Sequence, residues 1–264
     1  MLDHLNGATR IHYIVGDPIA QVKSPSDVTR ALVAQGRNAL VVPAHVAPAQ
    51  LRAWVAGVSL AQNVDSIIVT VPHKFACFDL CSSTTEHAAF LRAVNTMRRG
   101  PDGGWHGDMG DGPGMLRALQ DKGYEPKGKS ALLAGAGGAG SAIAHSLALA
   151  GVSRLAIHDT DAQRRQALVE RLAALGLCPV THGSADPTGF DLVVNATTAG
   201  MQADDPYPID VTRLQPGTMA ACAITAPPVS PFLVAARERG CASVTGGEMF
   251  GRVKELIVEF LLGR

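Results

Sequence analysis

Hydrophobic and polar positions form short runs along the chain, and these runs switch repeatedly between strand type and helix type. Residues 10–15 alternate as a half-buried strand does, whereas 66–70 and 191–194 are continuous apolar runs of the kind found in buried strands. Between such runs, apolar residues recur at helical spacing, for example over 48–57 and 162–175. Strands that alternate with helices predict an α/β fold with parallel sheets.

Cap and turn residues predict where several of these elements begin and end. Ser24 is a preferred N-cap residue and Pro25 follows it, so we expect a helix to begin there. Pro43 lacks an N–H group and should end the strand over 39–42. Apolar residues over 248–262 lie at helical spacing, so a final helix should pack back on the first domain.

A glycine-rich stretch follows the apolar run 130–134 and precedes a helical pattern. In the pattern G-x-G-x-x-G, Gly135 allows a tight turn, Gly137 lets the backbone approach a pyrophosphate, and Gly140 lets the helix pack on the strand. Phosphates would then bind the N–H groups at the helix N-terminus. We therefore predict a dinucleotide site that includes Gly135, Ala136, Gly137, Gly138 and Ala139.

Asp159 ends the next predicted strand, where an acidic residue should meet the adenosine ribose. Its carboxylate would accept hydrogen bonds from ribose hydroxyls but would repel the extra phosphate of NADP, at about 4 kcal/mol for a close charge pair. The sequence thus favours NAD over NADP. Arg164 and Arg165 could partly offset the repulsion, although a solvated helix face explains them more simply.

These patterns predict an α/β protein of two domains, with a Rossmann-type doubly wound nucleotide domain inserted into an α/β substrate domain. The boundaries are expected at residues 1–107 for the first segment of the substrate domain, 108–240 for the dinucleotide-binding domain and 241–264 for the C-terminal segment of the substrate domain.

Charge and composition narrow the classes of partner. In 264 residues, 23 Lys and Arg balance 23 Asp and Glu, so there is no basic field for nucleic acid and no polybasic membrane patch. The five cysteines are scattered and suggest buried thiols instead of a metal site. Without a signal or spanning segment, we expect a cytoplasmic monomer or homodimer that binds a small molecule.

Several short motifs, in order along the chain, resemble those of the shikimate/quinate dehydrogenase family. The matching stretches are Gly16-Asp-Pro-Ile-Ala, Lys23-Ser-Pro25, Val69-Thr-Val-Pro-His-Lys74, Ala93-Val-Asn-Thr96, Gly107-Asp-Met-Gly-Asp111, Gly135-Ala-Gly-Gly-Ala139, Asn195-Ala-Thr-Thr-Ala-Gly-Met201 and Ser230-Pro-Phe-Leu233.

The resemblance implies transfer of a hydride between a ring hydroxyl of shikimate or quinate and a nicotinamide. It assigns the hydroxyl proton to a pair formed by Lys74 and Asp111, since a carbinol gives up a hydride readily only when its proton is drawn off. Without the motifs, Lys74 would be interpreted as a surface lysine and Asp111 as a helix N-cap.

The same resemblance assigns further contacts. Ser24, Thr70 and Asn95 should bind the substrate, although they could equally be an N-cap serine, a strand-end threonine and a turn asparagine. The residues expected to line the dinucleotide, in addition to the glycine loop, Asp159 and Arg164, are Asn195, Ala196, Thr197, Gly246 and Met249. An alternative interpretation of Met249 is that its side chain only packs in the hydrophobic core.

At several positions where the family binds its substrate, this sequence has a different residue. Val22 stands where the family has the first of two serines for the substrate carboxylate, Thr225 stands at a tyrosine, and Val253 at a glutamine. Met109-Gly110 replaces the usual Asn-Thr. One lost hydrogen bond to a charged group is worth about 1.5–3 kcal/mol, so we expect poor shikimate binding and an altered, less polar substrate.

Three alternatives remain open from the sequence. The departures fit a nucleotide-binding regulatory protein that lost turnover. A methylene-tetrahydrofolate dehydrogenase also combines a catalytic lysine with such a nucleotide domain, but Gly107–Asp111 gives it no support. A methyltransferase shares the glycine loop, but its closing hairpin is a poor match to the terminal helix.

Overall fold

The computed structural model describes residues 5–202 and 204–263. The chain divides into two compact units: unit 1 comprises Met1–Gly110 and Lys254–Arg264, and unit 2 comprises Asp111–Val253. Each unit has its own sheet. The predicted α/β fold, with a nucleotide-type unit inserted into a second α/β unit, is confirmed.

Unit 1 is built on a mixed sheet with the strand order β2-β1-β3-β5-β6-β4. The strand β1 pairs in parallel with β2 and β3, whereas β5 runs antiparallel to β3 and β6. The strands are β1 (Arg10–Gly16), β2 (Ala39–His45), β3 (Val64–Val69), β4 (Ser83–Thr84), β5 (Thr96–Arg99) and β6 (Trp105–Asp108). The helices are α1 (Ser24–Ala34), η1 (Pro48–Gln50), α2 (Leu51–Ser59), α3 (Lys74–Phe78) and α4 (Glu86–Leu91).

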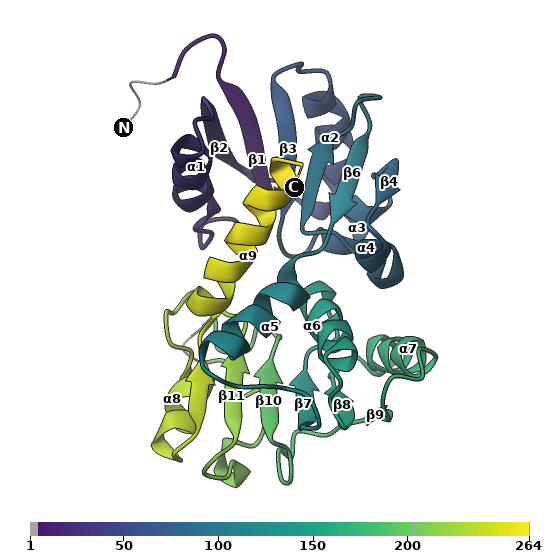
Figure 1. The fold of residues 1–264 in the computed structure, drawn as a ribbon, viewed down its shortest axis with the longest axis vertical. Helices are drawn as coiled ribbons and strands as arrows, with labels where there is room; N and C mark the ends of the chain where they lie inside the picture. Colours follow the sequence, from purple (N-terminus) through teal and green to yellow (C-terminus); the bar gives the residue numbers. More distant parts are fainter. Residues whose placement is uncertain (1–4, 203, 264) are drawn as a thin grey trace. The chain divides into compact units, whose positions relative to one another are not determined.

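Unit 2 contains a parallel sheet with the strand order β12-β11-β10-β7-β8-β9, and Figure 1 shows α5 and α6 in front of its strands. Counted from β7, this is the order 3-2-1-4-5-6 of a Rossmann fold. The strands are β7 (Ser130–Ala134), β8 (Arg154–His158), β9 (Val180–His182), β10 (Leu192–Asn195), β11 (Met219–Cys222) and β12 (Ala242–Val244). The helices are α5 (Asp111–Asp121), α6 (Gly138–Leu149), α7 (Ala162–Ala173), η2 (Val211–Arg213), α8 (Pro231–Glu238) and the first half of α9 (Gly246–Leu261).

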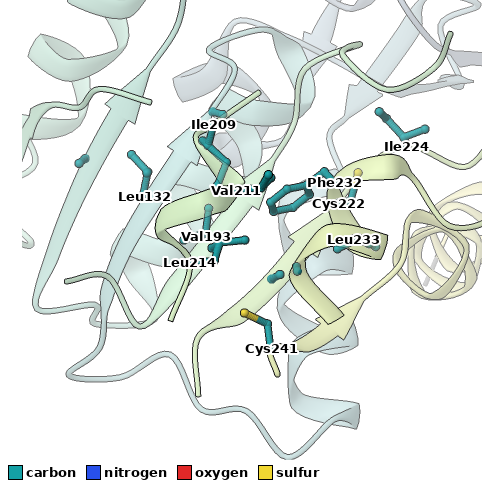
Figure 2. Close-up of a cluster of buried hydrophobic side chains, with 14 residues drawn as sticks. Leu132, Val193, Ile209, Val211, Leu214, Cys222, Ile224, Phe232, Leu233 and Cys241 are labelled. Carbon is teal, nitrogen blue, oxygen red and sulfur yellow. The ribbon is translucent and has the colours of Figure 1, made fainter. Parts of the chain in front are cut away.

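The apolar runs of unit 2 form its core. Figure 2 shows one cluster that includes Leu132 of β7 and Val193 of β10 together with Phe232 and Leu233 of α8. Each of these four side chains is at most 1 % exposed. The continuous apolar strands are therefore explained by burial within a parallel sheet.

Several element ends differ from the sequence predictions, and two of the differences have a clear physical reason. The strand β2 continues through Pro43 to His45, and it lies at the edge of its sheet, where a missing N–H group is tolerated. The helix α9 begins at Gly246, two residues before the predicted start. There the Glu248 carboxylate accepts the Thr245 N–H (2.8 Å) and the Thr245 hydroxyl accepts the Glu248 N–H (3.2 Å). This is a capping box.

The boundary that the sequence placed near residue 240 differs from the division seen in the structure. The strand β12 pairs with β11 over residues 242–244, so this segment belongs to the sheet of unit 2. The chain leaves unit 2 only within α9, between Val253 and Lys254. The second half of α9 lies in unit 1, as expected for the whole terminal helix.

None of the helices in the described part of the chain combines the length and apolar character required to cross a bilayer.

Candidate functional site

The glycine loop of unit 2 lies at the switch point of its sheet. The strands β7 and β10 are neighbours, and the strand order reverses between them. The segments that follow these strands, residues 135–140 with the start of α6 and residues 196–200, therefore begin at the carboxyl edge where open α/β sheets bind their ligands.

Three glycines in this loop meet different surroundings. Gly135 has a φ of 102°, and a Cβ there would lie 2.8 Å from the carbonyl group of Ala196. A Cβ at Gly140 would collide with the carbonyl oxygen of Gly135. At Gly137, by contrast, a Cβ would meet nothing within 4 Å. Gly135 and Gly140 are thus required by packing, while Gly137 faces open space, as the backbone next to a pyrophosphate should.

The N-terminus of α6 is suited to an anion. Gly137 is its N-cap residue and provides no side-chain cap. The first N–H groups of a helix have no acceptor within the helix, and the macrodipole adds a partial positive charge. Ala136, Gly138 and Ala139 lie on this same turn, so the geometry fits a dinucleotide phosphate.

Asp159 is held inside unit 2 by backbone groups. Its Oδ2 atom accepts the N–H of Ala136 at 2.7 Å, and its Oδ1 atom accepts the N–H of Asp161 at 2.8 Å. The residue is 8 % exposed. Asp159 therefore connects the glycine loop to the turn between β8 and α7, a role that the sequence prediction did not consider.

Two arginines and a histidine lie close to this acid in the sequence. Arg165 donates from Nη1 to the Asp159 carbonyl at 3.1 Å, and Arg164 is exposed with its Nη2 atom 3.6 Å from Asp161. Among the described residues, buried Nε of Arg165 and buried Nδ1 of His158 lack a hydrogen-bond partner. Burial and the nearby Arg165 charge lower the pKa of His158.

Asn195 shapes the loop after β10. Its Oδ1 atom accepts the N–H (2.9 Å) and the hydroxyl (2.7 Å) of Thr197, and its Nδ2 atom donates to the Ala199 carbonyl at 3.1 Å. Asn195 is only 1 % exposed. The Ala196 N–H donates to Ala134 at 2.8 Å and so ties the loop to β7. The predicted dinucleotide contacts of these residues stay predictions.

The first turn of α9 carries the remaining dinucleotide candidates. Gly246 lies so close to the backbone of Ile224 that a Cβ would collide with the Ile224 carbonyl. Met249 is 5 % exposed and Thr225 is half-buried. Val253 is also 5 % exposed, and its side chain lies directly against Gly114 of α5. An apolar residue at position 253 is thus explained by packing within unit 2.

In unit 1, backbone hydrogen bonds bring three candidate residues together near the carboxyl end of strand β3. The Val69 N–H donates to the Asn95 carbonyl at 2.7 Å, and the Val94 N–H donates to the Lys74 carbonyl at 3.0 Å. Thr70 follows β3 directly, and Lys74 is the first residue of α3. Candidates for substrate binding and for proton transfer, which come from separate motifs, therefore lie close together in this unit.

The side chain of Asn95 also organises the end of unit 1. It is 3 % exposed, and its Oδ1 atom accepts the Gly110 N–H at 3.0 Å and the Thr96 hydroxyl at 3.2 Å. A threonine in place of Gly110, as the family pattern has, would retain this N–H donor.

Ser24 is not the N-cap of α1. The helix begins at Ser24 itself, with Lys23 as N-cap and no side-chain cap. The N-cap interpretation of Ser24 was therefore wrong, and its hydroxyl is not used for capping. The residue is 3 % exposed, in the loop that also contains Val22, whose N–H closes a turn onto Ile19 at 3.3 Å.

Asp111 is the first residue of α5 in unit 2 and is 6 % exposed. Its pairing with Lys74 of unit 1 stays a prediction. No group of three or more potential metal ligands occurs among residues 5–202 and 204–263. Burial raises the pKa of Cys77 and of Cys81 to about 12, which makes thiolate chemistry at these two residues unfavourable.

Comparisons of the sequence and of the structure with known proteins point to the same protein family. A sequence profile described as "Shikimate dehydrogenase substrate binding domain" matches residues 14–97. The shikimate dehydrogenase (NADP(+)) of Rubrobacter xylanophilus is 38 % identical over 247 residues, which cover 92 % of this chain and 87 % of that protein.

Solved structures resemble the whole chain. The ligand-free 5-ketofructose reductase of Gluconobacter sp. strain CHM43 has a TM-score of 0.84 at 28 % identity, covering 98 % of this chain and 95 % of the reductase. Quinate dehydrogenase from Corynebacterium glutamicum, solved in complex with NAD, has a TM-score of 0.85 at 26 % identity, covering 97 % and 94 %.

The preference for NAD predicted from Asp159 is wrong. The curated relatives, which are more similar to this chain than the quinate dehydrogenase, are named as NADP(+)-dependent enzymes. The prediction treated Asp159 as a carboxylate available to the ribose, whereas both of its oxygens accept backbone N–H groups and two arginines lie in the first turn of α7. An acid at this position can therefore serve the loop instead of selecting the cofactor.

Proposed function

Because this chain belongs to the shikimate dehydrogenase family, we propose that it is an oxidoreductase that transfers a hydride between NADP(+) and a ring hydroxyl of shikimate, quinate or a related cyclic hydroxy acid. The observation that carries this proposal is the match to the Rubrobacter xylanophilus enzyme, at 38 % identity over 92 % of the chain. We further propose that the protein is cytoplasmic and acts as a monomer or homodimer.

The glycine loop of unit 2 would hold the dinucleotide. Its phosphates would bind at the N-terminus of α6, beside Gly137, where a Cβ would meet nothing within 4 Å. Arg164 and Arg165 supply positive charge in the first turn of α7, the helix after β8. The bound cofactor supplies the hydride acceptor in alcohol oxidation and the donor in the reverse reaction.

Lys74 would handle the hydroxyl proton, with Asp111 as the acidic member of the pair. An amine that accepts the proton as the hydride leaves lowers the barrier to oxidation, and general acid–base catalysis of this kind contributes about 10²–10⁴-fold. The hydrogen bond from Val94 to the Lys74 carbonyl fixes the backbone from which this side chain extends.

Ser24, Thr70 and Asn95 would bind the substrate. Ser24 and Asn95 are each 3 % exposed, and Thr70 is half-buried. The hydroxyl of Ser24 is not engaged in capping and so can donate to a substrate oxygen. Val22 beside it cannot donate, which leaves a substrate carboxylate with fewer partners than two serines would offer.

A second candidate substrate is an uncharged polyhydroxy ketone. The Gluconobacter relative is a 5-ketofructose reductase, whose name identifies a keto sugar as its substrate. Val22, Thr225 and Val253, at positions where the family pattern has polar side chains, favour a ligand without a carboxylate. The hydride and proton chemistry would be unchanged.

A substrate screen tests the proposal. Oxidation of shikimate and quinate, and reduction of 5-ketofructose, would be followed by the absorbance of NADPH. We expect turnover of at least one of these compounds, and we expect Lys74→Ala to reduce kcat by at least 10²-fold while the Kd for NADP(+) stays within about twofold.

Lys127→Ala is the matched control, since Lys127 is an exposed lysine of unit 2 outside the proposed site. The comparisons favour this function over the regulatory, folate and methyltransferase alternatives. Absence of turnover for every compound, with NADP(+) still bound, would instead support a regulatory protein.

A further inference from the structure

A second concave site lies in unit 1, apart from the candidate catalytic residues. It is a pocket of about 270 Å³ among the start of β1, the start of β3, the end of β5 and the last turn of α9. Asp65, which lines it, is separated from Thr70 by roughly 16 Å of strand, at about 3.3 Å per residue. The pocket therefore lies at the opposite end of the sheet from Thr70 and Lys74.

The pocket is strongly positive. Its lining holds four arginines, Arg10, Arg37, Arg98 and Arg99, and one carboxylate, that of Asp65, and so carries an excess of three positive charges. Within the described ranges, Arg10 is the only one of the four that forms an ion pair with a carboxylate. We call this site the arginine pocket.

Two of its arginines are held in place by the fold. Arg10 donates from Nε to Asp65 at 2.9 Å and from Nη2 to the Gln62 carbonyl at 2.8 Å. Arg99 donates from Nε to the Val64 carbonyl at 2.9 Å and lies over the Trp105 ring at 4.8 Å. Carbonyl oxygens satisfy the donors of Arg99 but do not neutralise its charge.

Arg98 is positioned differently. Its guanidinium lies 4.9 Å from the centre of the Phe260 ring, so an aromatic face supports it from one side. Arg37 is exposed at the rim. These two side chains can therefore turn N–H groups toward a ligand without breaking an existing ion pair.

The remaining lining is apolar or uncharged at neutral pH. Leu32, Leu261 and Leu262 provide apolar surface, and Leu32 is 2 % exposed. His12 is buried with its Nδ1 atom 2.7 Å from the Ser66 hydroxyl, and burial lowers its pKa to about 4. The charge of the pocket is thus set by the arginines.

We propose that the arginine pocket binds a small organic anion that joins a carboxylate to a compact apolar ring. Planar guanidinium groups match a carboxylate with two parallel hydrogen bonds, and the leucines suit the apolar part of such a ligand. A volume near 270 Å³ is below that of sites for drug-sized ligands, so the ligand is correspondingly small.

Calorimetric titration of the full chain with benzoate tests this proposal. Acetate and benzyl alcohol serve as probes of the carboxylate alone and of the ring alone. We expect benzoate to bind more tightly than either, and Arg98→Gln to raise its Kd at least about tenfold, because a charge-assisted hydrogen bond is lost. Arg37→Gln, at an exposed position, provides the same test if the first variant does not fold.

Two control variants distinguish benzoate binding in the arginine pocket from binding elsewhere on the protein. Arg30→Gln removes an exposed arginine of unit 1 that pairs with Asp27 outside the pocket, and it should leave the Kd for benzoate unchanged. Ser24→Ala should also leave it unchanged. A Kd that responds to Ser24→Ala and not to Arg98→Gln would place benzoate in the substrate site and overturn the proposal. Tighter binding of inorganic phosphate than of benzoate would overturn it as well.

Discussion

The Oδ2 atom of Asp159 lies 2.7 Å from the backbone nitrogen of Ala136, in the middle of the glycine loop. The second carboxylate oxygen accepts the N–H of Asp161. One buried acid thus joins the loop after β7 to the turn after β8. A change at position 159 should therefore alter the glycine loop before any dinucleotide is bound.

Asp159→Asn should destabilise the free protein and weaken dinucleotide binding. The neutral amide has one acceptor oxygen in place of two charged ones, so one backbone N–H loses its acceptor, at about 1.5–3 kcal/mol. We expect the free energy of unfolding in urea to fall by this amount, and the KM for NADP(+) to rise while kcat changes little. Asp204→Asn, which removes an exposed acid of unit 2, should do neither.

Unchanged unfolding of Asp159→Asn, combined with a shift in the ratio of kcat/KM for NADP(+) and NAD, would contradict this role. That result would show that the carboxylate contacts the ribose.

Gly137→Ala and Gly140→Ala should separate binding from folding. A Cβ at Gly137 meets nothing within 4 Å, so we expect thermal stability to be kept while affinity for NADP(+) falls, since the methyl group would obstruct the pyrophosphate. A Cβ at Gly140 collides with the Gly135 carbonyl, so Gly140→Ala should lower the Tm. Differential scanning calorimetry and dinucleotide titration measure the two effects. Equal affinity of Gly137→Ala and the unchanged protein would exclude this site for the pyrophosphate.

His12 should make the protein sensitive to acid. Burial lowers its pKa from 6.5 to about 4. The charge of Asp65 raises this pKa and that of Arg10 lowers it, and both effects are smaller than that of burial. The unfolded chain therefore takes up a proton near pH 6.5, whereas the folded chain does so only near pH 4. This contribution to stability is complete above pH 6.5 and is lost as the pH falls toward 4, by about 3 kcal/mol at most.

Urea unfolding at pH 7, 5 and 4 measures this loss. His12→Gln should flatten the decrease in unfolding free energy, because glutamine does not titrate. His182→Gln, at an exposed position of β9, should retain it. A decrease of the same size in His12→Gln would assign the acid sensitivity to other groups.

Thr245→Val should weaken the start of α9. The substitution removes the hydroxyl that accepts the Glu248 N–H, and loss of an N-cap side chain costs about 1 kcal/mol. Urea unfolding should report a decrease of this size, and Thr181→Val, at an exposed strand position, should report none. A decrease no larger than that of Thr181→Val would show that the capping box does not stabilise α9.

Local patterns were sufficient for many elements. The predicted strand 130–134 has the same bounds in the structure, and the predicted strand 191–194 and helix 162–175 differ from the observed ones by one or two residues. The turn and cap residues at these ends act over a few positions, so neighbouring residues contain the necessary information. The glycine spacing likewise predicted the strand, loop and helix of the nucleotide-type unit.

Local sequence patterns could not predict contacts between residues that are far apart in the chain. Pro43 continues a strand because β2 is an edge strand, and the segment 242–244 joins unit 2 because it pairs with β11. The two-residue strand β4 has too little sequence to produce a pattern.

The sequence by itself determined the α/β class, the glycine loop and the set of candidate residues, because periodicity, caps and motif order are local properties of the chain. Only the tertiary structure decided which partners those residues have. It gave Asp159 the N–H groups of Ala136 and Asp161, and it started α1 at Ser24 itself, which leaves that hydroxyl outside the cap. The physical reason is that a carboxylate or hydroxyl binds whichever donor or acceptor folding brings within about 3 Å, and that neighbour can be far away in the sequence.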